Sequence, residues 1–279
     1  MGSRNGRWRK LKWRCKRGQD IRPAGLESKK GEVLAAAGTI LNPGVIGLLA
    51  AAGYDSLDVV RAPKATIILL GDEIVLEGLP HDGLVRDALG PQLPGWLQRL
   101  GVEVIATEYI SDELNLVVDA FAKATKSSDI IFTTGGTADG PRDHVHAAIA
   151  ELKGELIVDC VKVRPGHPML LAHINKVPLV GLPGNPQSAI VALLTLGQPV
   201  IDALMGRKEV ELNQIVTGDD IEVPEGFTRL VLGNVVDGWF EMGEHLGSAM
   251  LRGLAHSTGF AVADKSMEEG EMVAWLPLP

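Results

Sequence analysis

Acidic and polar residues that could take part in chemistry follow three short apolar runs of the chain, each in a segment rich in glycine or proline. The segments are "GDE" at 71–73, "TTGGTADGPRD" at 133–143 and "GLPGNPQSA" at 181–189. In open parallel sheets, ligands bind beyond the carboxyl ends of strands, where loops cross to the following helices. We therefore expect the three segments to form one ligand site.

The second segment has the features of an anion site. Gly135 and Gly136 allow the backbone to approach a ligand closely, and the helix expected after them offers N–H groups to an oxyanion. The pattern predicts a phosphate or a similar oxyanion as the ligand. Tight packing of a strand against a helix explains two adjacent glycines equally well. The residues assigned to binding here are Thr134, Gly135, Gly136 and Thr137.

The third segment predicts a rigid loop, because "GLPGNP" holds two prolines and two glycines among its residues. The side chain of Asn185 can hydrogen-bond the backbone of such a loop. A purely structural turn is the alternative. The residues assigned to binding in this loop are Pro183, Gly184, Asn185, Pro186 and Ser188.

Asp72 and Asp143 are the acids closest to these glycine segments. Mg²⁺ prefers a few carboxylates together with phosphate oxygens and water. The two aspartates therefore predict a site for Mg²⁺ and phosphate at neighbouring strand ends. A helix cap is the alternative role for each of them.

The segments around this site alternate between strand and helix patterns, which indicates an α/β fold with a doubly wound, mostly parallel sheet. Strands are expected at 65–70, 102–110, 129–134, 155–163 and 177–183, and helices at 93–101, 112–125, 143–152 and 187–205. Ser111 is expected to cap the 112–125 helix, with Asp112 and Glu113 in its first turn, where acids favour the helix dipole.

The chain divides into four parts by its sequence texture. Asn42 and Pro43 are expected to begin a helix that stops at Gly53. Short strands separated by glycines predict a C-terminal all-β module, a barrel or a sandwich. The parts are a basic leader at 1–20, expected to be disordered, a small connecting module at 21–63, the α/β domain at 64–206 and the all-β module at 207–279.

The composition excludes several classes of protein. The chain has 279 residues, 46% of them hydrophobic, which predicts a large buried core, and its net charge of -8 argues against general affinity for nucleic acid. Cys15 and Cys160 have no metal-binding spacing and are expected in a tail and in the core. We expect no secretory signal and no membrane-spanning run, and hence a cytoplasmic protein.

The segments "TTGGTADGPRD", "VRPGHP" and "GLPGNPQSA", in this order and with "GDEIV" upstream, resemble the signature of the molybdopterin-binding superfamily. The sequence is most similar to the molybdopterin molybdenumtransferase family, which has a counterpart in gephyrin. This resemblance implies a homodimeric enzyme of molybdenum cofactor biosynthesis. Such an enzyme receives adenylylated molybdopterin, cleaves the adenylyl group in a Mg²⁺-dependent step and inserts molybdate.

The resemblance assigns roles to individual residues. Asp72 and Asp143 match site acids of the family, which makes them the expected catalytic and Mg²⁺-binding residues. The family usually has "KPGKP" where this chain has Arg164, Pro165, Gly166 and His167. Arg164 is therefore expected to bind phosphate or molybdate. Pro165, Gly166 and His167 are assigned to substrate binding with it. For His167 the alternative is a structural role, as a hydrogen-bonded loop histidine.

Two departures from the family pattern leave other functions open. Ala138 stands where the family usually has serine, and the loop around it is closer to that of the molybdopterin adenylyltransferases. The family's long N-terminal portion has no counterpart here, so a second polypeptide that supplies it is a further expected partner. The alternatives are an adenylyltransferase, a catalytically idle molybdopterin carrier, and a nucleotide-processing enzyme of the competence-damage type, which the all-β module disfavours.

Overall fold

The computed structural model describes residues 16–138, 140, 143–208 and 211–279. The chain divides into two compact units, Met1–Asp58 and Val59–Pro279. Most of the basic leader predicted at 1–20, including Cys15, lies outside the described residues. The finer division at residues 63 and 206 stays a prediction.

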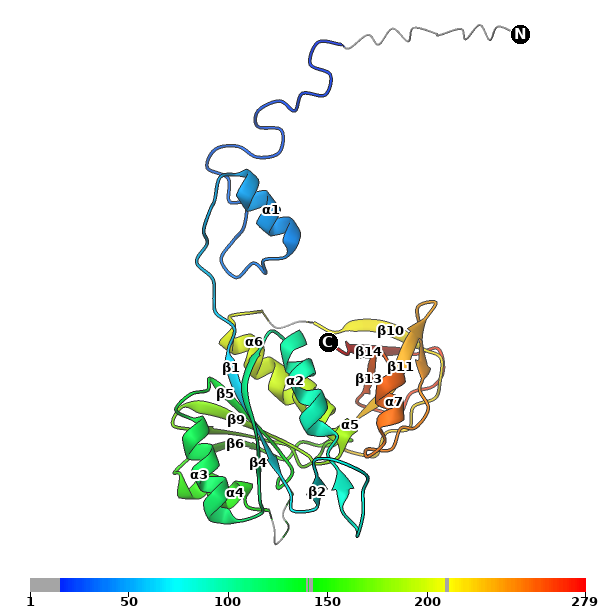
Figure 1. Cartoon of the computed structure of the whole chain (residues 1–279). Helices are drawn as coiled ribbons and strands as arrows, with labels where there is room; N and C mark the ends of the chain where they lie inside the picture. Colours follow the sequence, from blue (N-terminus) through cyan, green and yellow to red (C-terminus); the bar gives the residue numbers. More distant parts are fainter. Residues whose placement is uncertain (1–15, 139, 141–142, 209–210) are drawn as a thin grey trace, which may run out of the picture. The chain divides into compact units, whose positions relative to one another are not determined.

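The N-terminal unit contains the helix α1 (Pro43–Ala51; Figure 1). Asn42 caps this helix, since its Oδ1 accepts a hydrogen bond of 2.9 Å from the N–H of Val45. Proline occupies the first helical position, where its missing N–H costs nothing. The prediction of a helix that begins at Asn42 and Pro43 is confirmed, and the chain leaves it through Gly53 with φ of 93°.

The second unit is built on a six-stranded sheet in the order β4-β1-β5-β9-β8-β6. The strands are β1 (Lys64–Leu70), β4 (Glu103–Ile110), β5 (Ile130–Thr134), β6 (Glu155–Asp159), β8 (Leu170–Ile174) and β9 (Val177–Leu182). β4, β1, β5 and β9 are parallel, whereas β8 and β6 are antiparallel to their neighbours. The predicted mostly parallel α/β sheet is therefore confirmed.

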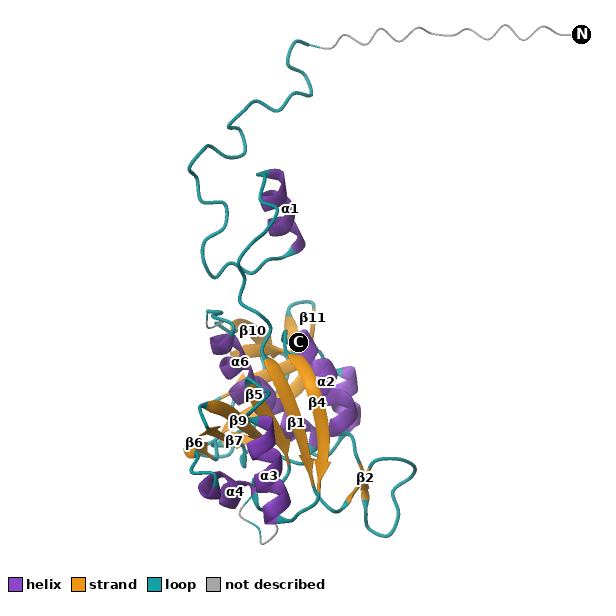
Figure 2. Ribbon diagram, turned by 60° about the vertical axis from the view of Figure 1, so that its left-hand side comes forward, coloured by secondary structure: helices purple, strands orange, loops and turns teal. Residues whose placement is uncertain are grey.

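Helices cover both faces of this sheet (Figure 2). Alternate strand residues point to opposite sides, so Ile67 and Leu69 join one core while Ile68 and Leu70 join the other. Because both faces are buried, the strands read as apolar runs without alternation. The first core holds α2 (Leu89–Arg99), α5 (Pro186–Ala192) and α6 (Gln198–Leu204), and the second holds α3 (Leu114–Ala124) and α4 (Val145–Glu151).

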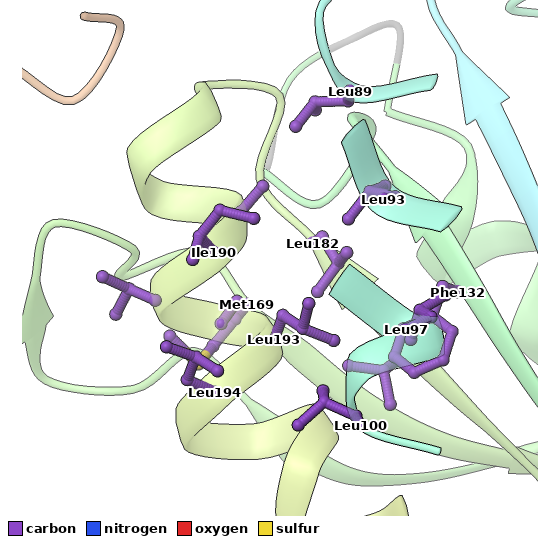
Figure 3. Packing of buried hydrophobic residues seen from close by; sticks show 14 of the residues in the cluster. Leu89, Leu93, Leu97, Leu100, Phe132, Met169, Leu182, Ile190, Leu193 and Leu194 are labelled. Carbon is purple, nitrogen blue, oxygen red and sulfur yellow. The ribbon is translucent and has the colours of Figure 1, made fainter. Parts of the chain in front are cut away.

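The first core is packed with leucines from two helices (Figure 3). Leu93 and Leu97 of α2 are fully buried, as is Leu193 in the π-helical turn Leu193–Gly197 that joins α5 to α6. Phe132 of β5 is fully buried in the same cluster. This packing holds the start of α5 against the sheet, beside the loop that follows β9.

The helix Pro186–Leu204, which α5 and α6 form together, has the length and mean hydropathy, 1.3, of a membrane span. The sequence prediction that no run reaches these values was wrong for this segment. Its most apolar window is 56% buried inside the protein, and every residue of α5 after Pro186 is buried. The burial identifies it as a core helix.

A second six-stranded sheet has the order β12-β10-β14-β13-β11-β7, and β12 also pairs with β11, which closes a barrel. Phe240 and Trp275 pack inside it. The predicted all-β module is thus a barrel. Its elements are β7 (Val163–Arg164), β10 (Asn213–Thr217), β11 (Thr228–Val236), β12 (Trp239–Met242), β13 (Gly259–Ala263), β14 (Met272–Pro277) and α7 (Leu251–His256); a separate pair is formed by β2 (Ile74–Val75) and β3 (Val85–Arg86).

The start of α3 differs from the prediction. The helix begins at Leu114 with Glu113 as its N-cap, and no side chain caps it. Ser111 is therefore not the cap, and the first turn of α3 contains no acid. The carboxylate of Asp112 instead accepts the N–H of Asp72, 3.2 Å away, on the neighbouring strand end.

The region between α4 and α5 contains two further differences. The strand predicted at 155–163 breaks at Cys160, whose φ of 61° ends the extended conformation, and Cys160 is exposed instead of lying in the core. Val163–Arg164 then joins the barrel through β11. Strand β8 was missed; it turns back into β9 through Asn175 and Lys176, both with positive φ.

Candidate functional site

Two of the predicted loops contact each other at the carboxyl ends of β5 and β9. The N–H of Gly135 donates a 3.0 Å hydrogen bond to the carbonyl oxygen of Leu182. A Cβ atom added to Gly184 would lie 3.9 Å from the Cα atom of Gly135. The structure therefore brings the Gly-Gly turn and the Pro-Gly-Asn loop together.

The loop's own conformation requires its two glycines. Gly135 and Gly136 have φ of 75° and 62°, which L side chains rarely adopt. A Cβ atom at Gly135 would also lie 3.0 Å from the carbonyl oxygen of Leu70. Thr134 and Thr137 are buried, and a Cβ at Gly181 would lie 2.8 Å from Cγ2 of Thr137. The N–H of Gly135 is already engaged by Leu182, so it is not among the groups that this loop can offer an anion.

Two acids face each other at the carboxyl ends of β1 and β4. The N–H of Asp72 donates to Oδ2 of Asp112, and the N–H of Asp112 donates to Oδ1 of Asp72, both at 3.2 Å. Asp112 was not predicted as a site residue. Its position directly after a strand that pairs with β1 was the available signal, since Leu70 and Ile110 are register partners.

The pKa of Tyr109 responds to the negative charge of this region. Its hydroxyl donates a hydrogen bond to the carbonyl oxygen of Gly71. Burial, followed by the charges of Asp72, Asp112 and Glu73, raises the pKa of Tyr109. The phenol therefore stays protonated near neutral pH and remains a donor.

Asp143 lies in the same part of the sheet edge. Its Oδ2 accepts a 2.7 Å hydrogen bond from the N–H of Gly140, so it closes a turn and does not cap α4, whose N-cap is His144. Nε2 of His144 lies 3.1 Å from the carbonyl oxygen of Asp112 and donates to it. We call Asp72, Asp112 and Asp143 the acidic edge. Arg142, which precedes Asp143 in the sequence, lies outside the described residues.

The acidic edge suits a hard cation by the chemistry of its donors, which are carboxylate oxygens. Backbone N–H groups hold Oδ1 of Asp72 and Oδ2 of Asp143, which orients both carboxylates. Within the described ranges, no three His, Cys, Asp or Glu side chains converge as a complete metal site. Mg²⁺ commonly keeps several waters and binds one or two carboxylates together with substrate phosphates, so this donor set fits it.

A pocket of about 340 Å³ lies between the Pro-Gly-Asn loop and the barrel. Arg164, His167 and Arg229 can carry positive charge, and none of the described lining residues is acidic. We call this the anion pocket. Of the predicted residues, it contains Arg164, Pro165, Gly166, His167, Pro183, Asn185 and Ser188, whereas Asp72, Thr134, Gly135, Gly136, Thr137, Asp143, Gly184 and Pro186 do not line it.

The two arginines of the anion pocket come from paired strands. Arg164 of β7 and Arg229 of β11 are register partners in a parallel pair. The guanidinium carbon of Arg164 lies 4.8 Å from the ring centroid of Phe227, and Nη1 of Arg229 donates to the carbonyl oxygen of Glu222 at 2.6 Å. Sequence reasoning missed Arg229, because no local pattern shows that β7 joins the barrel.

His167 has one ring nitrogen committed to the backbone. Its Nδ1 lies 2.6 Å from the carbonyl oxygen of Val161 and donates to it. The ring meets Phe227 edge-on, with 5.7 Å between centroids. Because Nδ1 is the donor to the carbonyl, Nε2 is the nitrogen that can serve a ligand, and it donates when the imidazole is protonated.

The chain is similar in sequence to known proteins. Residues 66–203 match the sequence profile described as a probable molybdopterin binding domain. Over 224 residues the chain is 33% identical to the molybdopterin molybdenumtransferase of Bacillus subtilis, covering 79% of this chain and 52% of that protein. The enzyme of the same name from Staphylococcus aureus strain COL is 28% identical over 216 residues, covering 76% of this chain and 52% of that protein.

The fold is similar to that of a solved MoeA protein. The crystal structure of a molybdopterin biosynthesis MoeA protein from Pyrococcus horikosii superposes with a TM-score of 0.78 at 24% identity, over 91% of this chain and 64% of that one. The chain spans about half the length of the curated relatives it matches. Residues 66–203 therefore match the molybdopterin-binding domain family, and about three quarters of the chain is similar to molybdopterin molybdenumtransferases.

Proposed function

We propose that the chain acts in molybdenum cofactor biosynthesis: it binds adenylylated molybdopterin, cleaves its adenylyl group and inserts molybdate. One observation carries the proposal. The acidic edge and the anion pocket, which have opposite charge, adjoin the same pair of touching loops at Gly135 and Gly184. A cation site beside an oxyanion site suits a reaction that cleaves a phosphoanhydride and takes up molybdate.

The acidic edge is the proposed site of adenylyl cleavage. Asp72 and Asp143 would hold Mg²⁺, with Asp112 beside them. When bound, this ion stabilises the charge that develops as the phosphoanhydride breaks. The N–H groups of Gly136 and Thr137 would bind and orient the phosphate oxygens, since backbone donors at a glycine turn suit anions.

The anion pocket is the proposed site of molybdate or of a phosphate of the substrate. Arg164 and Arg229 can each grip an oxyanion through two N–H groups. His167 can add a third donor through Nε2 when the imidazole is protonated. The paired barrel strands β7 and β11 therefore supply both arginines of this pocket.

Assembly and location belong to the same proposal. We infer a cytoplasmic homodimer, as the resemblance to the family implies, and a second polypeptide as a candidate partner that completes the enzyme. Sedimentation of the purified chain tests the dimer, and a clean monomer at tens of micromolar would contradict it.

The activity is tested by AMP release from adenylylated molybdopterin, with a full-length molybdenumtransferase as the reference. We expect tight binding and weak turnover, because a partial constellation still positions the substrate and retains some catalysis. Turnover equal to the reference would mean that Asp72, Asp143 and their loops suffice. Zero turnover with tight binding would favour a molybdopterin carrier.

A further inference from the structure

The 245–250 segment of the chain forms one wall of the anion pocket through Leu246 and Ser248. It contains neither helix nor strand. Hydrogen bonds to one residue at the start of α5 hold it instead. Nε2 of Gln187 donates to the carbonyl oxygens of His245 and Met250, at 2.9 and 2.8 Å, and the N–H of Gln187 donates to Ser248 at 2.9 Å.

Gln187 is well placed to control this wall because it is only 2% exposed. Both N–H donors of its amide are used, so their loss would leave two carbonyl groups without these partners next to the core. Asn185 adds one bond from its Nδ2 to Oγ of Ser248, at 3.3 Å. Gln187 thus donates three of these four hydrogen bonds to the 245–250 segment, two of them from its side-chain amide.

We propose that Gln187 is a positioning residue that holds the 245–250 segment as a wall of the anion pocket and so sets the pocket's affinity for oxyanions. The inference rests on the proposed function, because it takes an oxyanion as the ligand. Gln187 also lines the pocket, but the carbonyl oxygens of His245 and Met250 engage both N–H donors of its side-chain amide. Its amide acts through the carbonyl groups of His245 and Met250.

The test compares the full chain with two variants by calorimetry with sodium molybdate and, separately, inorganic phosphate. Gln187→Met keeps the length of the side chain and removes both donors. Gln92→Met is the matched control, since Nε2 of Gln92 donates to the carbonyl oxygen of Ala88 on α2, outside the anion pocket. We expect Gln187→Met to weaken molybdate binding about tenfold and Gln92→Met to leave it within about twofold.

Amide hydrogen exchange gives a second readout. In the wild-type chain, molybdate should slow exchange in the 245–250 segment, and Gln187→Met should speed it there while the strands β1 and β5 stay protected. Equal molybdate affinity in wild type and Gln187→Met would overturn the role of Gln187 but not the anion pocket. The same holds if molybdate does not slow amide exchange in the 245–250 segment. Absence of molybdate and phosphate binding by the wild type would overturn the anion pocket as well.

Discussion

The acidic edge and the anion pocket differ in how the chain builds them. The acidic edge uses loops that follow β1, β4 and β5 of a single parallel sheet, so Asp72 and Asp112 meet because their strands are neighbours. The anion pocket needs two sheets, because Arg164 and Arg229 are partners in the barrel sheet, whereas Asn185 comes from the loop after β9 of the α/β sheet. The cation site therefore depends on the α/β domain, and the anion site depends on the barrel as well.

The largest effect is expected from a substitution in the anion pocket that leaves the acidic edge unchanged. Arg229→Ala should weaken molybdate binding by about 10- to 100-fold, since a hydrogen bond to a charged group contributes roughly 1.5–3 kcal/mol. Calorimetry without Mg²⁺ measures it. Arg252→Ala is the control, because Arg252 is exposed and outside the pocket. Unchanged molybdate affinity in Arg229→Ala would show that Arg229 does not contribute to anion binding.

The complementary substitution addresses the acidic edge. Asp112→Asn keeps an oxygen that can accept the N–H of Asp72 but removes a negative charge. We expect Mg²⁺ affinity to fall about tenfold, while Mg²⁺-free molybdate binding stays the same.

Titration of the chain with Mg²⁺ measures this change. Asp82→Asn serves as the control, since the side chain of Asp82 is 94% exposed. A matching loss of molybdate affinity in Asp112→Asn would mean that the two regions are not separable.

Asp129, at the opposite end of β5, is an acid with a structural role. Arg61 binds both its carboxylate oxygens at 2.6 Å, and the N–H of Lys64 binds one at 2.8 Å. The hydrogen bond from Arg61 lowers the pKa of Asp129 below its usual 3.8, although burial opposes this. A depressed folded-state pKa contributes stability that is present above the unfolded value and lost as pH falls through the folded value.

Asp129→Asn should therefore reduce the free energy of unfolding at neutral pH. The difference from wild type should shrink as pH falls below 3.8, where the wild-type carboxylate also becomes protonated. Urea unfolding at several pH values measures both. A difference that does not change with pH would show that the ion pair with Arg61 contributes nothing to stability.

The smallest expected effect is a shift in the titration of Tyr109. Negative charges at Asp72 and Asp112 help to raise its pKa above the usual 10.0, so Asp72→Asn should lower the pKa of Tyr109 towards that value. Ultraviolet absorbance against pH in a Tyr54→Phe background isolates the signal, because the chain has two tyrosines. No shift in Asp72→Asn would show that the charge of Asp72 does not contribute to the raised pKa.

Sequence reasoning reached the parts of this account that depend on local pattern. Apolar runs such as 65–70 predict buried strands, and Asn42 with Pro43 predicts a helix start, because these signals act within a few residues. Gly135 and Gly136 mark the turn that the structure shows. Each of these features is decided by neighbours in the chain.

The rest depended on contacts between distant segments. Arg229 and Gln187 have no local signal, because their roles arise from β7 pairing with β11 and from a loop lying on α5. Ser111 carried a cap signal, but the chain bends at Asp112 to meet Asp72, so the helix starts later. Tertiary contacts decided these positions, and a single sequence does not show which distant residues they join.

The most direct test of the account is calorimetry of adenylylated molybdopterin with the chain, with and without Mg²⁺. The proposal that the acidic edge and the anion pocket form one substrate site predicts binding that Mg²⁺ strengthens by about tenfold or more. Asp112→Asn should remove most of that gain, and Arg229→Ala should weaken binding under both conditions. Absence of binding with and without Mg²⁺ would contradict the proposed site as a whole.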